Sequence, residues 1–421
     1  MNQDLVMIKE IEIDRVRHLA GIPIPIVNDA ETGVRHLLLT GKNGSGKTSV
    51  LDALASYLNA CCQDRFFFQY ESFIADGQSK LDGFIRDEAS MAEIENLKHD
   101  IQSWKETLEQ ERQGVRLSFV NNAEAMPFAF TAGKFILAYF KADRAFVADK
   151  PEHVEKVQLK ENYAIMDEPR KLFIKYLVDR KVSQSLLQTN NEAEKADRIR
   201  VWFDQFEQML REVFEDDTLR LDFDVNTFEF RIREKGKEPY DFNAMSAGYA
   251  AIIDIVVNII MRMEEGTGNS FCFDMPGIVL IDELETHLHY QLQRKILPFL
   301  TRVFPHVQFI VSTHSAFILS SIDNATIYDL ENNTLVKDGL SNIPYEGIVE
   351  GYFDAPTLST QLKEKFERYK QLAQKDAVSD DELLEMQKLS LYLDEIPDYL
   401  ALEIATEYRR LKLEFEMREG K

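Results

Sequence analysis

An eight-residue run with the pattern G-x-x-x-x-G-K-T has the chemistry of polyphosphate binding. It spans residues 41–48 (Gly-Lys-Asn-Gly-Ser-Gly-Lys-Thr). Its glycines allow backbone N–H groups to curl around phosphate oxygens, its second lysine reaches the β- and γ-phosphates, and its threonine hydroxyl suits Mg²⁺. The pattern predicts a nucleotide phosphate site with contacts from Gly41, Asn43, Gly44, Ser45, Gly46, Lys47, Thr48 and Ser49.

The residues on both sides of this loop have the pattern that such a site needs. An apolar strand, Leu37–Leu39, precedes the loop, and apolar residues follow it at helical spacing, at Val50, Leu51, Leu54 and Leu58. A strand that leads through the loop into a helix places the positive end of the helix dipole beside the phosphates. The alternative is a glycine-rich turn that contains Lys-Thr, which gives no reason for the two flanks.

A second motif supplies the acidic groups that cleavage of a phosphate bond requires. The apolar run Ile278–Ile281 ends in Asp282 and Glu283. Such a run is typical of a buried parallel strand, and ligands of open α/β sheets bind at the carboxyl ends of these strands. We expect Asp282 to hold Mg²⁺ and Glu283 to polarise the attacking water.

A third motif places a histidine at the same edge of the predicted sheet. The apolar strand Phe309–Val311 runs into Ser-Thr-His-Ser at residues 312–315. The interval from Asp282 to His314 has room for one helix and a return strand, so the two residues would reach neighbouring strand ends. We expect His314 to contact the γ-phosphate. Taken alone, an isolated histidine is more often a residue of the core or the surface.

A fourth motif, residues 243–249 (Asn-Ala-Met-Ser-Ala-Gly-Tyr), opens a predicted helix. Its apolar residues have the spacing of one buried face, at 249, 252, 253, 256, 257 and 260. Ser246 is placed to cap this helix, Gly248 allows another backbone to approach, and a capped helix start attracts anions. Alone, the motif is an ordinary helix start. Beside a phosphate loop and an acidic strand end, it indicates a second phosphate contact.

Together these motifs resemble those of ABC-type ATPases. Residues 41–48 correspond to Walker A, 245–249 to the signature, 278–283 to Walker B and His314 to the switch histidine. The resemblance implies an α/β fold, with a P-loop mixed sheet and flanking helices. The signature departs from the usual L-S-G-G-Q because alanine and tyrosine replace one glycine and the glutamine. In place of a glutamine loop, only Arg144 marks the region after a predicted strand.

The segments 280–288 and 304–315 resemble the soluble ATPases of the RecF and overcoming-lysogenization-defect (OLD) branch. That resemblance implies ATP and Mg²⁺ as cofactors, catalytic roles for Glu283, His314 and Lys47, and metal contacts from Thr48 and Asp282. It also implies head-to-tail pairs, in which Ser246 and Gly248 act in trans on the γ-phosphate held by a partner. Motifs of this kind cover roughly residues 5–60 and 240–335.

Composition limits the possible classes of function. The 421 residues carry a formal charge of −23, 45% hydrophobic residues and a mean hydropathy of −0.29. The charge argues against broad, charge-driven DNA binding and suits either a basic protein partner or simple solubility. The apolar runs are too short to span a bilayer, and the first residues do not form a signal peptide. Three cysteines, at 61, 62 and 272, predict buried thiols in a reducing cytoplasm.

The intervals between the motifs predict insertions and a tail. We assign the head to residues 1–60, 115–150 and 215–345, helical insertions to 61–114 and 151–214, and a helical tail to 346–421. Arg86–Arg112 carries a heptad seam that suits either a short coiled coil or a helix packed on the head. The basic helix Pro169–Lys181 suits nucleic acid, although a solvated face is the commoner explanation. The tail suits assembly or partner docking, or it covers the sheet of the head.

Local patterns predict several smaller elements. The two prolines of Ile22–Ile26 indicate an edge strand, Leu219–Ile232 predicts a hairpin, and Ser379 starts a capped helix. Asp222 and Asp224 share one face of the hairpin. Because no third carboxylate accompanies them, we interpret this face as exposed surface rather than a metal site.

The predicted tail is too small and too helical for the nuclease domain that follows the head in OLD proteins. The tail, Tyr345–Phe353 included, resembles ATPase subunits of bacterial anti-phage systems. The Septu type acts with a separate HNH nuclease, and the PARIS type with a TOPRIM nuclease. The resemblance implies a cytoplasmic bacterial ATP hydrolase, a homodimer or higher oligomer, that controls a separate nuclease. The alternatives are a DNA-binding repair ATPase of the RecF or Rad50 kind and, third, the nucleotide-binding subunit of a transporter.

Overall fold

The computed structural model describes most of the chain. The described residues are 6–27, 33–64, 66–87, 90–268, 271, 273–343, 347–348, 360–375, 378–394 and 402–419. The contacts divide the chain into two compact units, Met1–Asn342 and Ile343–Lys421.

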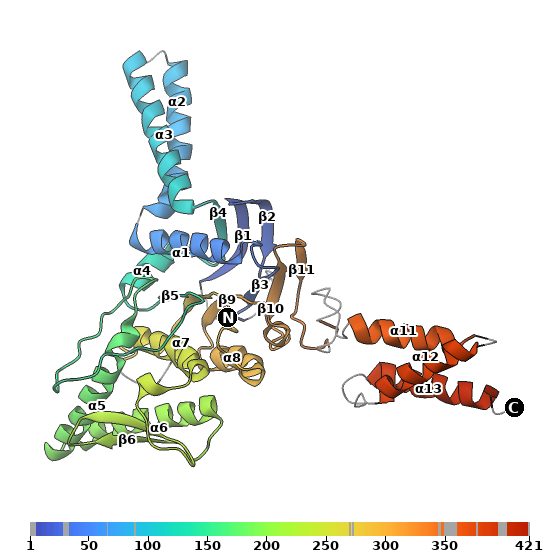
Figure 1. The fold of residues 1–421 in the computed structure, drawn as a ribbon. Helices are drawn as coiled ribbons and strands as arrows, with labels where there is room; N and C mark the ends of the chain where they lie inside the picture. Colours follow the sequence, from blue (N-terminus) through green and yellow to red (C-terminus); the bar gives the residue numbers. More distant parts are fainter. Residues whose placement is uncertain are drawn as a thin grey trace. The chain divides into compact units, whose positions relative to one another are not determined.

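A six-stranded sheet forms the centre of the first unit (Figure 1). Its order is β11-β10-β3-β9-β8-β5, and every pair is parallel except β10 with the edge strand β11. The strands are β3 (His36–Thr40), β5 (Ile136–Phe140), β8 (Gly277–Ile281), β9 (Val307–Ser312), β10 (Ala325–Asp329) and β11 (Thr334–Val336). All residues of the five parallel strands are buried, as expected for a parallel sheet covered on both faces. The predicted α/β class is confirmed.

A second, antiparallel sheet of order β2-β1-β4 packs against the six-stranded sheet. It consists of β1 (Met7–Val16), β2 (Leu19–Pro25) and β4 (Val115–Val120). The prolines of β2 fall on an edge strand, as predicted. Side chains of this sheet, of the six-stranded sheet and of α1 (Lys47–Gln63) share one apolar core. Buried Gln308 of β9 joins the sheets, because its amide bonds to both backbone groups of Ile8.

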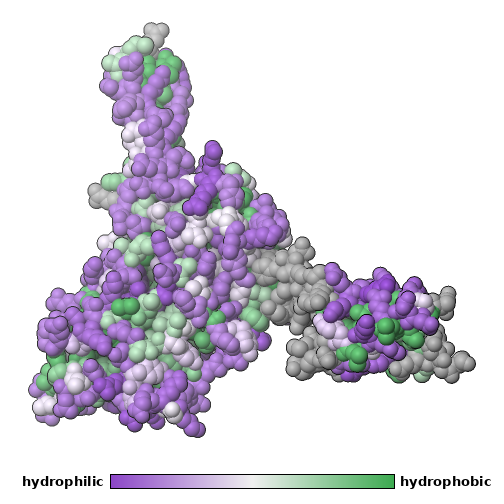
Figure 2. Space-filling view, viewed as in Figure 1, coloured by the Kyte–Doolittle hydropathy of each residue, from purple (hydrophilic) through white to green (hydrophobic). Residues whose placement is uncertain are grey.

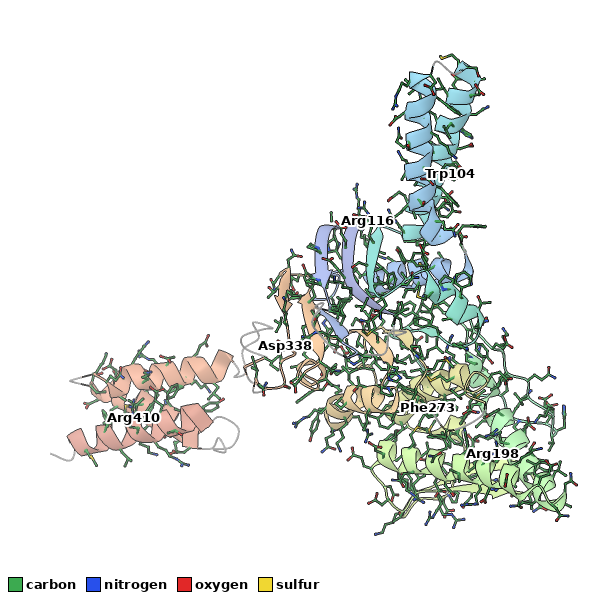
Figure 3. The ribbon with its side chains drawn as sticks, turned by 180° about the vertical axis from the view of Figure 1, so that it is seen from behind. Trp104, Arg116, Arg198, Phe273, Asp338 and Arg410 are labelled. Atoms are coloured by element: carbon green, nitrogen blue, oxygen red, sulfur yellow. The ribbon has the colours of Figure 1, made fainter. Side chains whose placement is uncertain are left out.

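A helical hairpin projects from this part of the unit (Figure 1). After the short helix η1 (Phe67–Gln69) it consists of α2 (Tyr70–Arg86) and α3 (Met91–Arg112). The predicted heptad seam packs within this hairpin: Ile101 and Leu108 are buried, and Trp104, labelled in Figure 3, contacts Phe73. The expected start at Arg86 is wrong, because Arg86 ends α2 and Ser90 caps α3 through a capping box. Apolar residues gather near the distal end (Figure 2), where Ile85 and Met91 are exposed.

Residues 151–214 are only partly helical, contrary to the prediction. Residues 151–168 are irregular, and they are followed by η2 (Pro169–Leu172), α5 (Phe173–Thr189) and α6 (Ala193–Phe214). The buried guanidinium of Arg262 accounts for the conformation of residues 163–167. It donates to the carbonyls of Tyr163, Ala164 and Asp167, so these groups do not need helical hydrogen bonds.

The basic residues of the predicted helix Pro169–Lys181 interact with their own chain. Arg170 pairs with Asp254 and Glu168, Lys171 with Glu168, Lys175 with Glu155, while Arg180 lies over Tyr176 and Trp202 and Lys181 over Phe203. The interpretation as a solvated face therefore holds for Lys171, which is exposed, but not for Arg170, which is largely buried. These contacts also remove the main sequence argument for a nucleic-acid surface on this helix.

The remaining elements of the first unit surround the sheet. They are α4 (Ala125–Thr131), β6 (Arg220–Asp224), β7 (Glu229–Arg233), η3 (Phe242–Ala244), α7 (Ala247–Met263), α8 (Tyr290–Val303) and α9 (Ala316–Leu319). β6 and β7 form the predicted hairpin. Helix α7 was expected to bury one face, but every residue from Ala251 to Met263 is buried, because β5, α6, α8 and η2 all contact it.

The second unit has its own apolar core. It contains α11 (Thr360–Ala373), α12 (Asp380–Asp394) and α13 (Leu402–Glu419), whose stripes pack on one another through Phe366, Tyr369, Leu411 and other residues. Ser379 and Glu382 form the predicted capping box. Leu358, Pro397 and most of Tyr345–Phe353 lie outside the described residues, as does Cys272, whereas Cys61 and Cys62 are buried free thiols as predicted. None of the helices in the described part is long and apolar enough to cross a membrane.

The closest approach of α2 and α3 allows a stability test. A Cβ on Gly77 would lie 2.9 Å from Cγ1 of Ile101 and 3.0 Å from the Trp104 ring. We expect Gly77→Leu to destabilise the hairpin by about 1–3 kcal/mol, as overpacking does. Backbone amides of α2 and α3 should exchange their hydrogens faster.

Gly83→Leu is the matched control in the same helix, because nothing lies within 4 Å of its Cβ position. Leucine there should slow exchange slightly through its better helix propensity. Equal exchange in the two variants would contradict the packing assigned to the hairpin.

Candidate nucleotide-binding site

The loop between β3 and α1 has a backbone that requires glycine. Gly41, Gly44 and Gly46 have φ angles of +129°, +85° and +102°. A Cβ on Gly41 would lie 2.9 Å from Oγ of Ser45, and one on Gly46 would lie 2.8 Å from Leu19. The loop therefore forms a tight cradle, in which Gly41 and Gly46 leave no room for a side chain. Gly46 is also the N-cap residue of α1, so the start of this helix faces the cradle. Figure 1 shows α1 and β3 on either side of this turn.

Lys47 places a buried ammonium group inside this cradle. Its Nζ donates to the carbonyl oxygens of Gly41 at 2.8 Å and Lys42 at 3.0 Å. Burial lowers the pKa of Lys47, and the nearby carboxylate of Glu283 acts in the opposite direction. Asn43 is exposed on the loop, and Ser49 lies half-buried in the first turn of α1. These placements agree with a phosphate site, because they put the ammonium of Lys47 and the polar side chains of Asn43 and Ser49 on or next to one short loop.

Thr48 and Asp282, the two residues predicted to contact Mg²⁺, are in direct contact. The hydroxyl of Thr48 donates to Oδ2 of Asp282 at 2.8 Å, and the hydroxyl of Ser312 donates to Oδ1. Hydroxyl and carboxylate oxygens are suitable Mg²⁺ ligands, and one or two protein ligands suffice when phosphates and water complete the shell. The described residues contain no cluster of three or more potential metal ligands. The pair therefore fits a magnesium–nucleotide complex better than a separate metal centre.

Glu283 has an unusual backbone conformation directly after β8. Its φ is +45°, in the left-handed region, where a residue with a Cβ costs roughly 1–2 kcal/mol. Its N–H donates to the hydroxyl of Ser312 at 2.8 Å, and its half-buried carboxylate accepts from the hydroxyl of Thr286 at 3.3 Å. The turn aims a carboxylate near Lys47 without committing it to an ion pair.

Arg144 supports the backbone of the turn that contains Glu283. The side chain is 5% exposed, and its two terminal nitrogens donate to the carbonyls of Asp282, Glu283 and Leu284. The sequence suggested Arg144 only as a marker of the glutamine-loop region. The structure gives it a different task, which is to hold the backbone that presents Glu283.

His314 lies at the end of β9 with its backbone fixed by Glu285. Glu285 accepts from the N–H of His314 at 2.6 Å and from the hydroxyl of Thr313 at 2.7 Å. Burial lowers the pKa of His314 below its usual 6.5 and Lys47 lowers it further, against the opposite effect of Glu285, Glu283 and Asp282, so the net shift favours the neutral imidazole. The sequence analysis missed Glu285; the signal available was a third acidic residue in Asp282-Glu283-Leu284-Glu285.

The predicted signature segment lies apart from the loop. Ser246 occupies the N-cap position of α7, but its exposed side chain makes no capping hydrogen bond, so that expectation is wrong. Gly248, in the first turn of α7, lies close to the backbone of His287. A Cβ on Gly248 would lie 3.0 Å from the carbonyl oxygen of His287. Tyr249, in place of the usual glutamine, stacks on Phe214 with 4.2 Å between ring centroids. Within the described residues, no side-chain hydrogen bond joins Ser246 to loop 41–48.

A cavity adjoins the loop on the side of the β1–β2 turn. It is lined by His18, Leu19, Ala20, Ile22, Lys42, Asn43, Ser45, Leu330, Glu331 and Asn333. Lys42 pairs with Glu331 at 2.7 Å there, which lowers the pKa of Glu331. The mixture of apolar and polar walls beside a phosphate cradle suits the base and sugar of a nucleotide.

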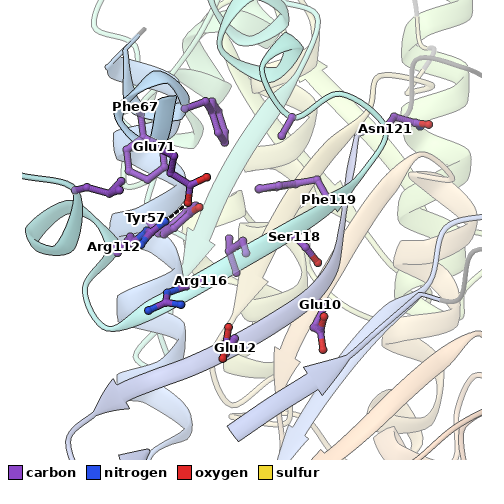
Figure 4. A pocket seen from close by; sticks show the side chains of 14 residues that line it. Glu10, Glu12, Tyr57, Phe67, Glu71, Arg112, Arg116, Ser118, Phe119 and Asn121 are labelled. Atoms are coloured by element: carbon purple, nitrogen blue, oxygen red, sulfur yellow. Dashed lines mark hydrogen bonds and ion pairs between the residues drawn. The ribbon is translucent and has the colours of Figure 1, made fainter. Parts of the chain in front are cut away.

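A separate cavity lies at the base of the helical hairpin (Figure 4). Its walls come from β1, β4, α1 and the hairpin, and the Glu71–Arg112 ion pair crosses it. It contains none of the predicted site residues.

On the hairpin β6–β7, Asp222 pairs with Arg233 and Asp224 accepts from the N–H of Asn226, which agrees with a surface role.

Comparisons with known proteins show which proteins this chain resembles. A family model described as "AAA domain, putative AbiEii toxin, Type IV TA system" matches residues 37–320. The chain is 38% identical over 94 residues to "Retron Ec83 probable ATPase" of Escherichia coli, covering 22% of this chain and 17% of that protein. It is 34% identical over 133 residues to "Septu protein PtuA" of Bacillus mycoides, covering 30% and 18%. The chain thus spans less than a fifth of the length of these curated relatives.

Among solved structures, the SMC head domain from Thermotoga maritima matches 76% of this chain and 94% of its own length. The TM-score is 0.34 and the identity 14%. A TM-score of that size is too low for an inference about function.

Lys47 should determine nucleotide affinity. We expect Lys47→Ala to weaken ATP binding about ten- to a hundredfold, because hydrogen bonds to charged groups contribute about 1.5–3 kcal/mol. Isothermal titration calorimetry measures this directly. Lys98→Ala is the control, since Lys98 is exposed on α3 and lines neither the loop nor the cavity beside it. Unchanged ATP affinity in Lys47→Ala would show that phosphate binds elsewhere.

Proposed function

Since the chain belongs to the AAA-domain family matched above, we propose that it binds ATP with Mg²⁺ and hydrolyses it as an ABC-type ATPase. The observation that carries this proposal is the 2.8 Å hydrogen bond between Thr48 and Asp282. It joins the phosphate cradle to the acidic end of β8, which is the arrangement that phosphoryl transfer needs. The resemblance to the ATPase subunits of defence systems, through the retron and Septu relatives, supports the same class.

Each residue of the cradle and of the neighbouring strand ends would have its own role in ATP hydrolysis. Lys47 and the backbone N–H groups of the loop would bind the phosphates, and Thr48 with Asp282 would hold Mg²⁺, which neutralises phosphate charge when bound. Glu283 would accept a hydrogen bond from the attacking water and orient it. His314, as a neutral imidazole, would donate to or accept from groups at the γ-phosphate without adding charge.

Hydrolysis would require two copies of the chain. Ser246 is exposed at the positive end of α7, a helix of 17 residues, and lies outside the hydrogen-bond network of the loop. We propose that Ser246 and Gly248 of one subunit complete the phosphate site of another. The close contact of Gly248 with the His287 carbonyl fixes the start of α7 against residues that follow Glu283.

For the biological role, we propose a cytoplasmic ATPase in a bacterial anti-phage system that controls a separate nuclease of the HNH or TOPRIM type. The two defence-system relatives support this role. The net charge of −23 favours a basic protein partner over broad contact with DNA. The tail helices, with Leu384, Leu391, Leu413 and Met417 exposed, are proposed to hold subunits together or dock that partner.

The second candidate is a repair ATPase that binds DNA directly. The projecting hairpin is the feature that favours it, but residues 70–112 carry eleven acidic and five basic side chains. DNA-end binding by the isolated protein, dependent on ATP and retained at 150 mM salt, would support this candidate and contradict control of a separate effector.

Glu283→Gln should separate ATP binding from hydrolysis. The amide keeps the shape of the side chain but is a poor base, so turnover should fall about 10²–10⁴-fold while ATP affinity stays near wild type. The ATP-bound protein should then persist as a larger species in size-exclusion chromatography. Glu229→Gln, an exposed carboxylate on β7, is the control and should keep normal turnover. Wild-type turnover in Glu283→Gln would remove Glu283 from the reaction.

Ser246→Arg tests whether the site is shared between subunits. The added side chain would occupy the place of a partner's γ-phosphate, so hydrolysis should stop while one subunit still binds ATP. Mixing Ser246→Arg with Lys47→Ala should restore part of the activity, because one composite site keeps two intact halves. Ser185→Arg, at an exposed serine of α5, is the control. Mixed dimers without activity would contradict sharing.

A further inference from the structure

The turn after β8 combines backbone strain with an unusual support. Glu283 and His287 both have positive φ angles, and a left-handed residue persists only where its surroundings determine it. Two kinds of contact determine the conformation of Glu283. The hydroxyl of Ser312 accepts from its N–H, and Arg144 donates to the carbonyls of three successive residues, Asp282, Glu283 and Leu284.

The shape of the guanidinium explains why an arginine occupies this position. Nη1 donates to the carbonyls of Lys141 and Asp282, and Nη2 donates to those of Glu283, at 3.0 Å, and Leu284, at 3.3 Å. Three of these carbonyls belong to the turn after β8, and the fourth, that of Lys141, follows the neighbouring strand β5. A planar fork with a fixed spacing between its donors satisfies such a set, whereas the ammonium of lysine is a single point.

A buried carboxylate on α7, that of Asp254, interacts electrostatically with this arginine. Asp254 is 2% exposed and pairs with Arg170. Burial raises the pKa of Asp254 to about 6, and Arg170 and Arg144 both act against that rise. Asp254 belongs to the helix that Ser246 starts, and its ion pair joins that helix to Arg170.

We propose that Arg144 is a positioning residue for hydrolysis, one that holds residues 282–284 in the strained conformation that directs the Glu283 carboxylate to the attacking water. This proposal rests on the ATP hydrolysis proposed above. Arg144 touches neither nucleotide nor metal in this account and acts through the backbone of Glu283.

Arg262 offers a control with the same chemistry in another place. It is 3% exposed and, like Arg144, donates to several backbone carbonyls, including those of Leu137, Tyr163 and Asp167. A purely structural role for buried arginines predicts similar behaviour of the two lysine variants. A positioning role predicts that only Arg144→Lys changes turnover in the folded protein.

The experiment compares Arg144→Lys and Arg262→Lys in the full chain. We expect Arg144→Lys to lower kcat for ATP at least tenfold while ATP affinity, measured by calorimetry, changes less than threefold. Arg262→Lys should lower the melting temperature but keep kcat within threefold of wild type. In the Glu283→Gln background, Arg144→Lys should cause no further loss, because both changes disable the same group. A kcat of wild-type size in Arg144→Lys would overturn the proposal.

Hydrogen exchange in the nucleotide-free protein tests the same idea without turnover. The N–H groups of Glu283 and Leu284 bond to Ser312, so their exchange reports on the turn. Arg144→Lys should speed their exchange at least tenfold, and Arg262→Lys should leave it within threefold. If the wild type hydrolyses no ATP, the proposed function fails, and this readout still judges Arg144: unchanged exchange in Arg144→Lys would overturn its role in holding the turn.

Discussion

The pairing of three buried parallel strands is the constraint on which the candidate site depends. β9 lies between β3 and β8, with Leu39 opposite Ser312 and Ile281 opposite Val311. This register brings the loop after β3, the carboxylates after β8 and the histidine after β9 to one edge of the sheet. The hydrogen bonds from Thr48 and Ser312 to Asp282 then join all three strand ends. A shift of register by one residue would separate these groups.

Much of this arrangement follows from the sequence because its signals are local. The pattern of Gly41–Thr48 requires positive φ angles and small residues, and continuous apolar runs mark strands buried on both faces. The capping box at Ser379 and the prolines of β2 are equally local in character. In each case the decisive interactions connect residues a few positions apart.

The features that the sequence did not predict depend on distant partners. Arg144 and the carbonyls that it holds are about 140 positions apart, and Arg262 holds an irregular segment about 100 positions away. Neither arrangement has a periodic pattern. The sequence suggested a solvated face for the basic residues near Arg170, because it does not show their distant partners. These acidic and aromatic partners come from α6, α7 and the irregular segment. Glu285 was overlooked because its role depends on the backbone of His314 in another strand.

The candidate site therefore depends on two sets of groups. The first is the set of groups that would contact nucleotide, and the second is the set of buried charges that fixes their backbone. The central claim is that the edge shared by β3, β8 and β9 cleaves ATP. The most direct measurement is phosphate release from ATP by the purified wild-type chain, with and without Mg²⁺. The account predicts saturable release that requires Mg²⁺. Failure to release phosphate at any protein concentration, together with no detectable ATP binding, would contradict it.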